Sequence, residues 1–354
     1  MYSINCDQIE NGNLLKTKKT KKYTIINYNK ETVISEDLGN YRSIIINNNN
    51  NKIVSFSPPK SIKYNDFKEM NNIRDVYFEE IVEGTMLHMF YDCEKWNIST
   101  KFNIDAKSSY FYYGNYKRTF SKMFYETVET FEDKEWMNKL NKDYCYSFVL
   151  QHPYNRIVVP LFCKKLYLIS IYKIVNNEIY TIHNSEEMKN MPKEMNYPEN
   201  YNIHDYFQVE NLFNDIKDYN KVGVMMKNKT TQVRSKIINP IFSYVKQLRG
   251  NQPKLQYHFI TLKKNDRVEE YLHYYEEHRD FFEFYEEQYN ELVETLYHYY
   301  NTFQDKHSKK IPYYLRKHLF QLSKEKNVDK SHIFSYLKTI DEAIIMHTIN
   351  YNLK

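Results

Sequence analysis

The chain has 354 residues, of which 42% are hydrophobic and 27% charged, and its formal net charge is +5. This length and composition predict a folded core in one large domain or two ordinary ones. The mild positive charge permits an RNA partner without requiring one.

Several common signatures are absent from the sequence. The cysteines form no Cys-x-x-Cys pair and there is no His-Glu-x-x-His run, so we expect no metal site. No apolar run approaches ~20 residues and no signal-peptide core is present, so we expect no membrane segment. We therefore expect a reduced, cytoplasmic protein that needs no cofactor. The cysteines are Cys6, Cys93, Cys145 and Cys163.

The first part of the chain alternates polar stretches with short β-rich runs. Residues 1–22 are polar and end in a lysine cluster, which predicts a solvated basic arm or, alternatively, a phosphate-binding arm. Residues 23–29, 42–46 and 52–56 are rich in isoleucine, valine and tyrosine and predict strands.

The most informative stretch covers residues 78–106. An acidic-glycine turn, Glu83-Gly84, leads into an apolar run at 86–91. A polar turn at 92–95 and an alternating run at 96–102 follow. Two β-rich runs joined by a few polar residues predict a β-hairpin.

The remaining elements follow in order. Residues 110–142 favour helix, 146–160 lead into a buried strand at 166–174, and 184–220 favour loops with short helices. A hydrophobic strand at 222–227 precedes the basic run Arg234-Ser235-Lys236. Apolar residues spaced by three, four and seven between Val268 and Phe303 predict one long amphipathic helix. Two further helices are predicted at 312–325 and 331–349.

Four of these segments together resemble the covalent nucleotidyltransferases, and in particular the RNA ligases of the phage tRNA-repair type. The turn at residues 81–84 resembles their Lys-x-Asp-Gly turn. The segment with Phe148, Pro153 and Asn155-Arg156-Ile157-Val158 resembles their Phe-x-Phe-Glu-x-x-x-Pro-x-Asn-Arg-Ile-Val segment. The strand at 222–227 resembles their Glu-Gly-hydrophobic strand, and the basic run their Lys-x-Lys.

The resemblance covers about residues 20–250 and implies an α+β fold. We expect a basic arm at 1–22, a nucleotidyltransferase-like core with antiparallel sheets at 23–250, and an all-α C-terminal domain at 251–354. Arg42, Lys60 and Asn65 resemble the family's lead-in to the Lys-x-Asp-Gly turn, although Ser43 replaces the usual glycine.

The residues that differ from the family pattern are the ones that would carry out the family's reaction. Ile81 occupies the position of the nucleophilic lysine, and an isoleucine has no lone pair with which to attack a phosphate. Val149 and Val222 replace family carboxylates, which would hold a divalent metal or the ribose hydroxyls. The resemblance thus implies a nucleotide pocket without catalytic residues.

Our first hypothesis is a catalytically inactive RNA-binding protein that recognises an RNA 5′ end, in particular an mRNA cap, in viral translation. An N7-methylated guanine is cationic and favours aromatic faces beside a carboxylate, a role open to Glu83. Tyr172 is a further stacking candidate. The expected nucleotide- and RNA-binding residues are Arg42, Lys60, Glu83, Phe111, Phe148, Arg156, Tyr167, Arg234 and Lys236.

Two alternatives remain open at this point. The chain could be an RNA ligase that forms a covalent nucleotidyl-lysine at a relocated lysine. It could also be an interaction protein that binds a protein partner through its C-terminal helices. The lysines that flank the expected site are Lys60, Lys63, Lys101 and Lys107.

Overall fold

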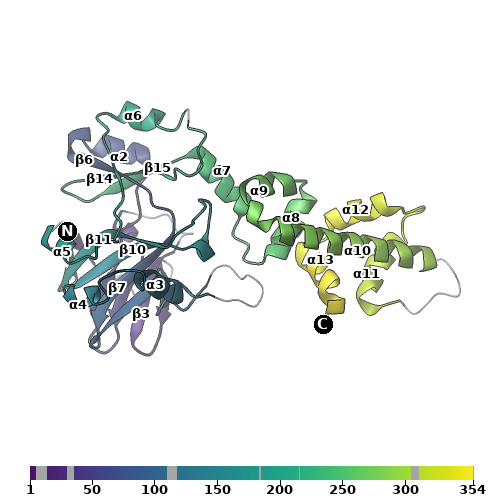
Figure 1. Cartoon of the computed structure of the whole chain (residues 1–354), viewed down its shortest axis with the longest axis horizontal. Coiled ribbons are helices and arrows are strands. Elements are labelled where there is room, and N and C mark those ends of the chain that lie inside the picture. The colour runs from purple at the N-terminus through teal and green to yellow at the C-terminus, as the bar shows by residue number, and fades with distance from the viewer. Residues whose placement is uncertain are drawn as a thin grey trace. The chain divides into compact units, whose positions relative to one another are not determined.

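The computed structural model describes residues 1–4, 14–29, 36–109, 118–182, 185–214, 216–303 and 311–353. The chain divides into two compact units, Met1–Gln247 and Leu248–Lys354 (Figure 1). The sequence placed this boundary at residue 250. The first unit contains all the described strands and the second is helical.

A seven-stranded antiparallel sheet forms the centre of the N-terminal unit, with the strand order β1-β12-β11-β10-β7-β8-β9. The predicted hairpin is confirmed as β7 and β8. Its turn residues Cys93 and Glu94 both have positive φ values, 49° and 61°, as a two-residue hairpin turn requires. The strands are β1 (Tyr2–Ser3), β7 (Thr85–Asp92), β8 (Lys95–Thr100), β9 (Asn103–Ile104), β10 (Tyr144–Gln151), β11 (Lys165–Val175) and β12 (Glu178–Thr181).

One face of this sheet is covered by α3 (Phe120–Val128) and α4 (Trp136–Lys139). Alternate residues of the strands, such as Leu87 and Met89, are fully buried in the resulting core because successive side chains of a strand point to opposite faces. The sequence predicted helix throughout 110–142, whereas the described part holds two helices joined by a loop.

A second, four-stranded sheet has the order β2-β3-β4-β5. Its last three strands are the three predicted from the early β-rich runs. The segment expected as a basic arm, residues 1–22, contains β1 and β2, which pair into sheets, while the lysine side chains of β2 are exposed. The strands are β2 (Leu15–Lys19), β3 (Tyr23–Tyr28), β4 (Ile44–Asn47) and β5 (Lys52–Phe56).

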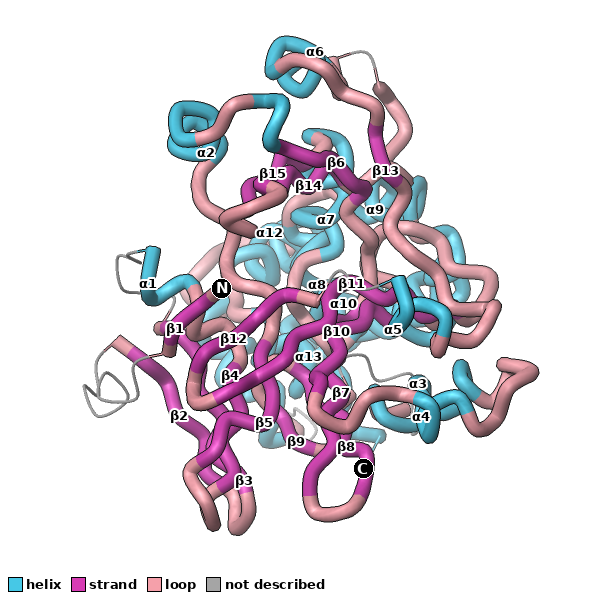
Figure 2. Tube along the Cα trace, turned by 90° about the vertical axis from the view of Figure 1, so that its left-hand side faces the viewer, coloured by secondary structure: helices cyan, strands magenta, loops and turns pink. Residues whose placement is uncertain are grey.

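A third sheet, with the order β13-β6-β14-β15, lies above the central sheet in Figure 2. The predicted strand at 222–227 is confirmed as β14. Helices α2 (Tyr64–Met70) and α6 (Tyr206–Asn211) belong to this part, with Phe67 and Val209 in the shared core. The strands are β6 (Val76–Glu80), β13 (Asn200–Tyr201), β14 (Gly223–Asn228) and β15 (Arg234–Ile238).

The C-terminal unit is built from helices, as predicted, but with different boundaries. The single helix predicted from 268 to 303 is two helices, because the chain breaks at Tyr275 and passes through a 3₁₀ turn at Glu276–His278. The Tyr271 hydroxyl and His278 Nδ1 lie 2.7 Å apart across this break. The helix predicted at 331–349 is also divided, at Ile340. The helices are α8 (Leu255–Lys264), α9 (Val268–Tyr274), α10 (Arg279–Phe303), α11 (Arg316–Leu322), α12 (Lys330–Thr339) and α13 (Glu342–Ile349).

The short helices of the first unit are α1 (Glu36–Gly39) and α5 (Ser185–Lys189), and α7 (Pro240–Arg249) contains the boundary between the units. In the part of the chain that the structure describes, no helix is both long and apolar enough to span a membrane.

Candidate functional site

A cavity of about 790 Å³ opens where the three sheets of the N-terminal unit meet. The β6–β7 turn contributes Ile81, Val82 and Gly84, and β10 contributes Val149. Gly84 has φ +148°, and a Cβ there would lie 2.4 Å from the carbonyl oxygen of Leu150. The turn can approach β10 this closely only because the residue is a glycine.

The two altered catalytic positions Ile81 and Val149 line this cavity together. Val222 lines a smaller neighbouring cavity of about 140 Å³, which also has Ile81 in its wall. The fold therefore brings together the three positions that the resemblance singled out, and all three carry aliphatic side chains. The described residues contain no group of three His, Cys, Asp or Glu side chains that could hold a metal ion.

Four of the five cationic side chains in the wall of the larger cavity form the cationic cluster: Arg42, Lys60, Arg234 and Lys236. Arg234 is the most buried, at 7% exposure, while the two lysines are exposed at the opening. Both guanidinium groups donate to the carbonyl oxygen of Pro58, Arg42 Nη1 at 3.5 Å and Arg234 Nη2 at 3.4 Å. Lys60 Nζ lies 5.6 Å from the centre of the Tyr28 ring.

None of these four cations forms an ion pair with a described carboxylate, and Arg234 Nε has no hydrogen-bond partner among the described residues. Burial and the neighbouring Arg42 lower the pKa of Arg234 to about 10. Burial and the same two arginines also lower the pKa of Lys236. Buried charges are normally paired, so this cluster has the electrostatics of a site for a polyanion.

Carboxylates are also present in the cavity wall, namely Asp66, Glu79 and Glu80. Glu79 forms an ion pair with Lys227, which lies on the neighbouring strand β14. Burial is the main cause that raises the pKa of Glu80. Glu79 and Lys227 were not among the residues predicted from the sequence, although a lysine within the otherwise apolar strand β14 was a signal for Lys227.

The structure corrects the expected role of Glu83. Its side chain is 7% exposed and lies outside the wall of the large cavity, so it does not share that cavity with Lys236. The carboxylate accepts hydrogen bonds from the backbone N–H groups of Val158, at 2.9 Å, and Val159, at 2.7 Å. Burial outweighs these hydrogen bonds and raises the pKa of Glu83 to about 7.

Arg156 also lies outside the wall of the large cavity. Its Nε donates to the carbonyl oxygen of Val158 at 3.0 Å. Asn155, in the same segment, is buried and donates to Thr85 Oγ1 at 2.8 Å. The segment that most resembled the ligases therefore fixes the chain beside the β6–β7 turn.

The expected stacking residues are not brought together. Phe148 is fully buried in the core beneath α3 and α4, and its ring stacks on Tyr146 at 6.3 Å. Tyr167 is half-buried in the wall of the cavity of about 140 Å³, and Tyr172 packs edge to face on Phe56. Phe111 lies outside the described residues.

Comparison with known proteins relates this chain to nucleic-acid ligases. No protein-family profile matches it. It is 27% identical over 154 residues to an RNA ligase of Rhodothermus phage RM378, which corresponds to 39% of this chain and 35% of that protein. The chain thus spans about a third of the length of the phage ligase.

Solved structures with similarity to the chain include an RNA ligase mutant of Naegleria gruberi with AMP and Mn and an archaeal ATP-dependent RNA ligase. The first has a TM-score of 0.40 and 11% identity, covering 54% of this chain and 57% of that one. The second has a TM-score of 0.43 and 8% identity, covering 97% and 75%. Because both TM-scores are below 0.5, the relationship rests on the sequence match and on the motif segments that meet at the cavity. The chain is related to the RNA ligase-like nucleotidyltransferases.

Proposed function

We propose that the N-terminal unit binds the 5′ end of an RNA through its phosphates and does not transfer a nucleotide. The observation that carries this proposal is the cationic cluster of Arg42, Lys60, Arg234 and Lys236, which has no carboxylate partner among the described residues. A 5′ triphosphate or a cap carries several negative charges in a short chain. It would supply the missing counter-charges through charge-assisted hydrogen bonds.

The absence of transfer chemistry in the proposal rests on the residues around the same cavity. Nucleotidyl transfer needs a nucleophile at the α-phosphate, and Ile81 has none. Val149 and Val222 supply no oxygen ligands for the metal that would stabilise the transferring phosphate. A bound nucleotide would therefore meet donors that hold its phosphates but no nucleophile at the position of the family lysine.

Within this proposal, the ligand class that we favour is capped mRNA, with a role in the translation of viral messages. The phage origin of the matching RNA ligase supports the viral setting. Aromatic side chains for a methylated base would have to come from other residues than Phe148, which is fully buried.

The test compares RNAs of one sequence that differ only at the 5′ end. The full chain should bind 5′-triphosphorylated and capped RNA at least about tenfold more tightly than 5′-hydroxyl RNA, because each tenfold step needs only ~1.4 kcal/mol of added phosphate contact. Equal affinity for all three RNAs would exclude recognition of the 5′ end.

The RNA ligase alternative keeps specific support from the structure. Lys60, Lys63 and Lys236 line the cavity, as do the carboxylates of Glu79 and Glu80. An amine must come within about 3–3.5 Å of the α-phosphorus to attack it. Incubation with radiolabelled ATP or GTP and Mg²⁺ or Mn²⁺ distinguishes the two functions, because only the ligase would retain label on the denatured protein.

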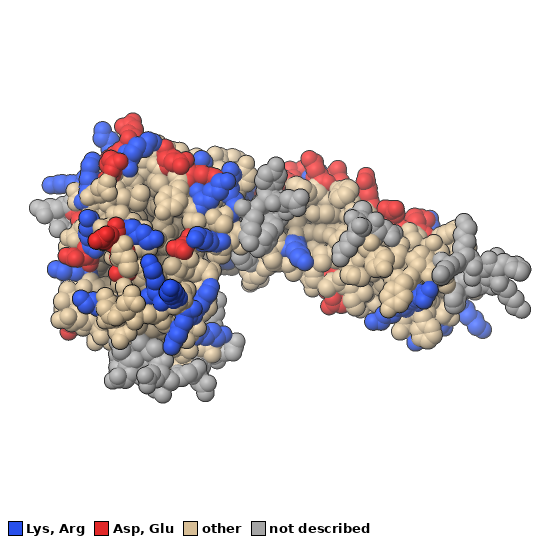
Figure 3. Space-filling view, turned by 90° about the horizontal axis from the view of Figure 1, so that it is seen from below, with Lys and Arg blue, Asp and Glu red and all other residues tan. Residues whose placement is uncertain are grey.

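The interaction alternative also has a feature to support it. A groove of about 640 Å³ in the C-terminal unit has Phe259, Leu272 and Phe282 in its wall. Acidic side chains follow one edge of this unit (Figure 3), and Glu283 and Glu287 contribute to the groove. RNA binding that survives removal of 5′ phosphates, together with capture of a basic partner by this unit, would favour that function.

A further inference from the structure

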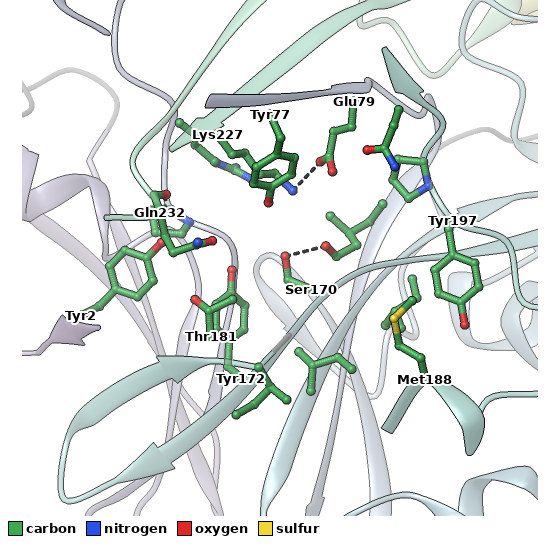
Figure 4. Close-up of a pocket in the computed structure, with 18 residues that line it drawn as sticks. Tyr2, Tyr77, Glu79, Ser170, Tyr172, Thr181, Met188, Tyr197, Lys227 and Gln232 are labelled. Carbon is green, nitrogen blue, oxygen red and sulfur yellow. Dashed lines mark hydrogen bonds and ion pairs between the residues drawn. The ribbon is translucent and has the colours of Figure 1, made fainter. Parts of the chain in front are cut away.

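Figure 4 shows a second cavity, which has a volume of about 250 Å³. Arg234 of the cationic cluster lies in its wall. It shares Glu79, Ile169, Pro198 and Arg234 with the larger cavity, so the two spaces adjoin. Ligand pockets generally measure about 300–1,000 Å³. The second cavity is thus of a size for one part of a nucleotide, while the larger cavity can hold the phosphates.

The polar feature of this second cavity is the ion pair between Glu79 and Lys227. The two side chains come from adjacent strands, β6 and β14, and point into the cavity from the same wall (Figure 4). They are only 13% and 8% exposed. The ion pair is made through Oε1 of Glu79, and Oε2 is not part of it. Lys227 Nζ has three donors and therefore keeps donors beyond those used by Glu79.

The other walls suit a flat aromatic ligand. Tyrosine rings from separate segments surround the space: Tyr2, Tyr77, Tyr172 and Tyr197. Arg234, whose Nε has no partner among the described residues, stands where the two cavities meet. Aromatic and guanidinium faces are the surfaces on which proteins stack nucleobases.

We propose that this second cavity binds a guanine base whose 5′ phosphates lie in the cationic cluster, with Glu79 and Lys227 reading the edge of the base. This inference rests on the proposed function and names the nucleotide that the site prefers. The Glu79 carboxylate accepts hydrogen bonds from the N1–H and the 2-amino group of guanine, and Lys227 donates to O6.

Guanine is favoured over the other bases because of the order of its donors and acceptors. It presents two adjacent donors next to an acceptor, which matches a carboxylate beside an ammonium group. Adenine presents only one donor on that edge, next to N1, and would leave one carboxylate oxygen buried without a partner. Sites that hydrogen-bond a ligand group reject analogues lacking it, since their own polar groups then remain unpaired.

The test measures equilibrium binding of five ligands by the full chain: GTP, ITP, ATP, UTP and inorganic tripolyphosphate. We expect GTP to bind at least about tenfold more tightly than ATP or UTP, the ratio that one well-placed bidentate pair gives. ITP, which lacks the 2-amino group, should fall between GTP and ATP. Equal affinity for all four nucleotides would overturn the inference.

A charge-swapped variant, Glu79→Lys/Lys227→Glu, keeps the ion pair but reverses the order of donor and acceptor. It should still bind tripolyphosphate, which reports that the chain is folded, while losing the preference for GTP over ATP. If the charge-swapped variant does not fold, a second variant, Glu79→Gln, takes its place. It should reduce the ratio of the affinity for GTP to the affinity for ATP. A preference for GTP that persists in a folded variant would contradict base reading by this pair.

These ligands also separate the two proposals. If tripolyphosphate binds but GTP gains nothing over ATP, the phosphate site stands and the guanine site fails. If tripolyphosphate does not bind, the proposed function fails as well. A short RNA with a 5′-terminal triphosphorylated guanosine, compared with free GTP, shows which source of guanine is preferred.

Discussion

The carboxylate of Glu83 accepts a 2.7 Å hydrogen bond from the backbone N–H of Val159. A second hydrogen bond, from Val158, makes the contact bidentate. The side chain of Gln151 reinforces the same turn by donating to the backbone carbonyl of Glu83 at 2.9 Å. Glu83 therefore joins the β6–β7 turn to the segment after β10, and a change at this residue should appear in stability rather than in ligand contacts.

The stability of the N-terminal unit should depend on pH through Glu83. Its pKa is raised from 4.5 to about 7, so between these values the folded chain holds a proton that the unfolded chain has lost. The free energy of unfolding then falls as pH rises through this window, by about 3 kcal/mol in total. Glu83→Gln cannot titrate, so its stability relative to wild type should increase from pH 5 to pH 8. Urea unfolding at several pH values measures this, and a constant difference would contradict it.

Arg234 should show a conflict between stability and binding. It is a buried cation that forms no direct ion pair with a described carboxylate, and replacing a buried charge by an apolar side chain of similar volume is often stabilising. We expect Arg234→Met to raise the free energy of unfolding by about 1 kcal/mol and to weaken tripolyphosphate binding. Thermal unfolding and calorimetric titration test both parts, and a variant that is less stable with unchanged binding would exclude an anion site here.

Replacing Phe148 should change the stability of the fold and leave ligand affinity unchanged. Because its ring is fully buried beneath α3 and α4, Phe148→Leu should lower the free energy of unfolding by about 1–2 kcal/mol. Ligand affinity, measured at a temperature where the variant is fully folded, should stay at the wild-type value. A selective loss of RNA affinity would indicate instead that the Phe148 ring stacks on the ligand.

Hydrophobic alternation was sufficient to predict the hairpin at β7 and β8 and the strands β3 to β5. It could not show that Phe148 packs in the core whereas Val149 lines the cavity, because both residues are apolar and adjacent on one strand. The role of Glu83 was missed because a backbone N–H partner leaves no mark in the sequence. Lys227 and Glu79 meet only through the pairing of β6 with β14, a long-range register that local patterns do not fix.

A lysine placed at the position of the family nucleophile should not restore nucleotidyl transfer. In Ile81→Lys the new amine would face the cavity, but Val149 and Val222 would still offer no metal ligands. We expect no covalent label from radioactive ATP or GTP on this single variant. Val149→Glu and Val222→Glu can then be added in turn. A strong adduct on the single variant would show that the site holds its metal by other residues, such as Glu79 or Glu80.

The central claim, that RNA phosphates lie against Arg234 and Lys236, is tested most directly by the salt dependence of binding. Each neutralised phosphate contributes a slope of about −0.7 to log affinity against log salt for a single strand. The variant Arg234→Ala/Lys236→Ala should bind 5′-triphosphorylated RNA more weakly, with a slope that is flatter by about one to one and a half units. The matched control Lys95→Ala/Lys173→Ala removes the same charge at two exposed residues outside the cavity wall and should keep the wild-type slope. Unchanged affinity and slope in the Arg234/Lys236 variant would contradict the claim and move the RNA away from this cavity.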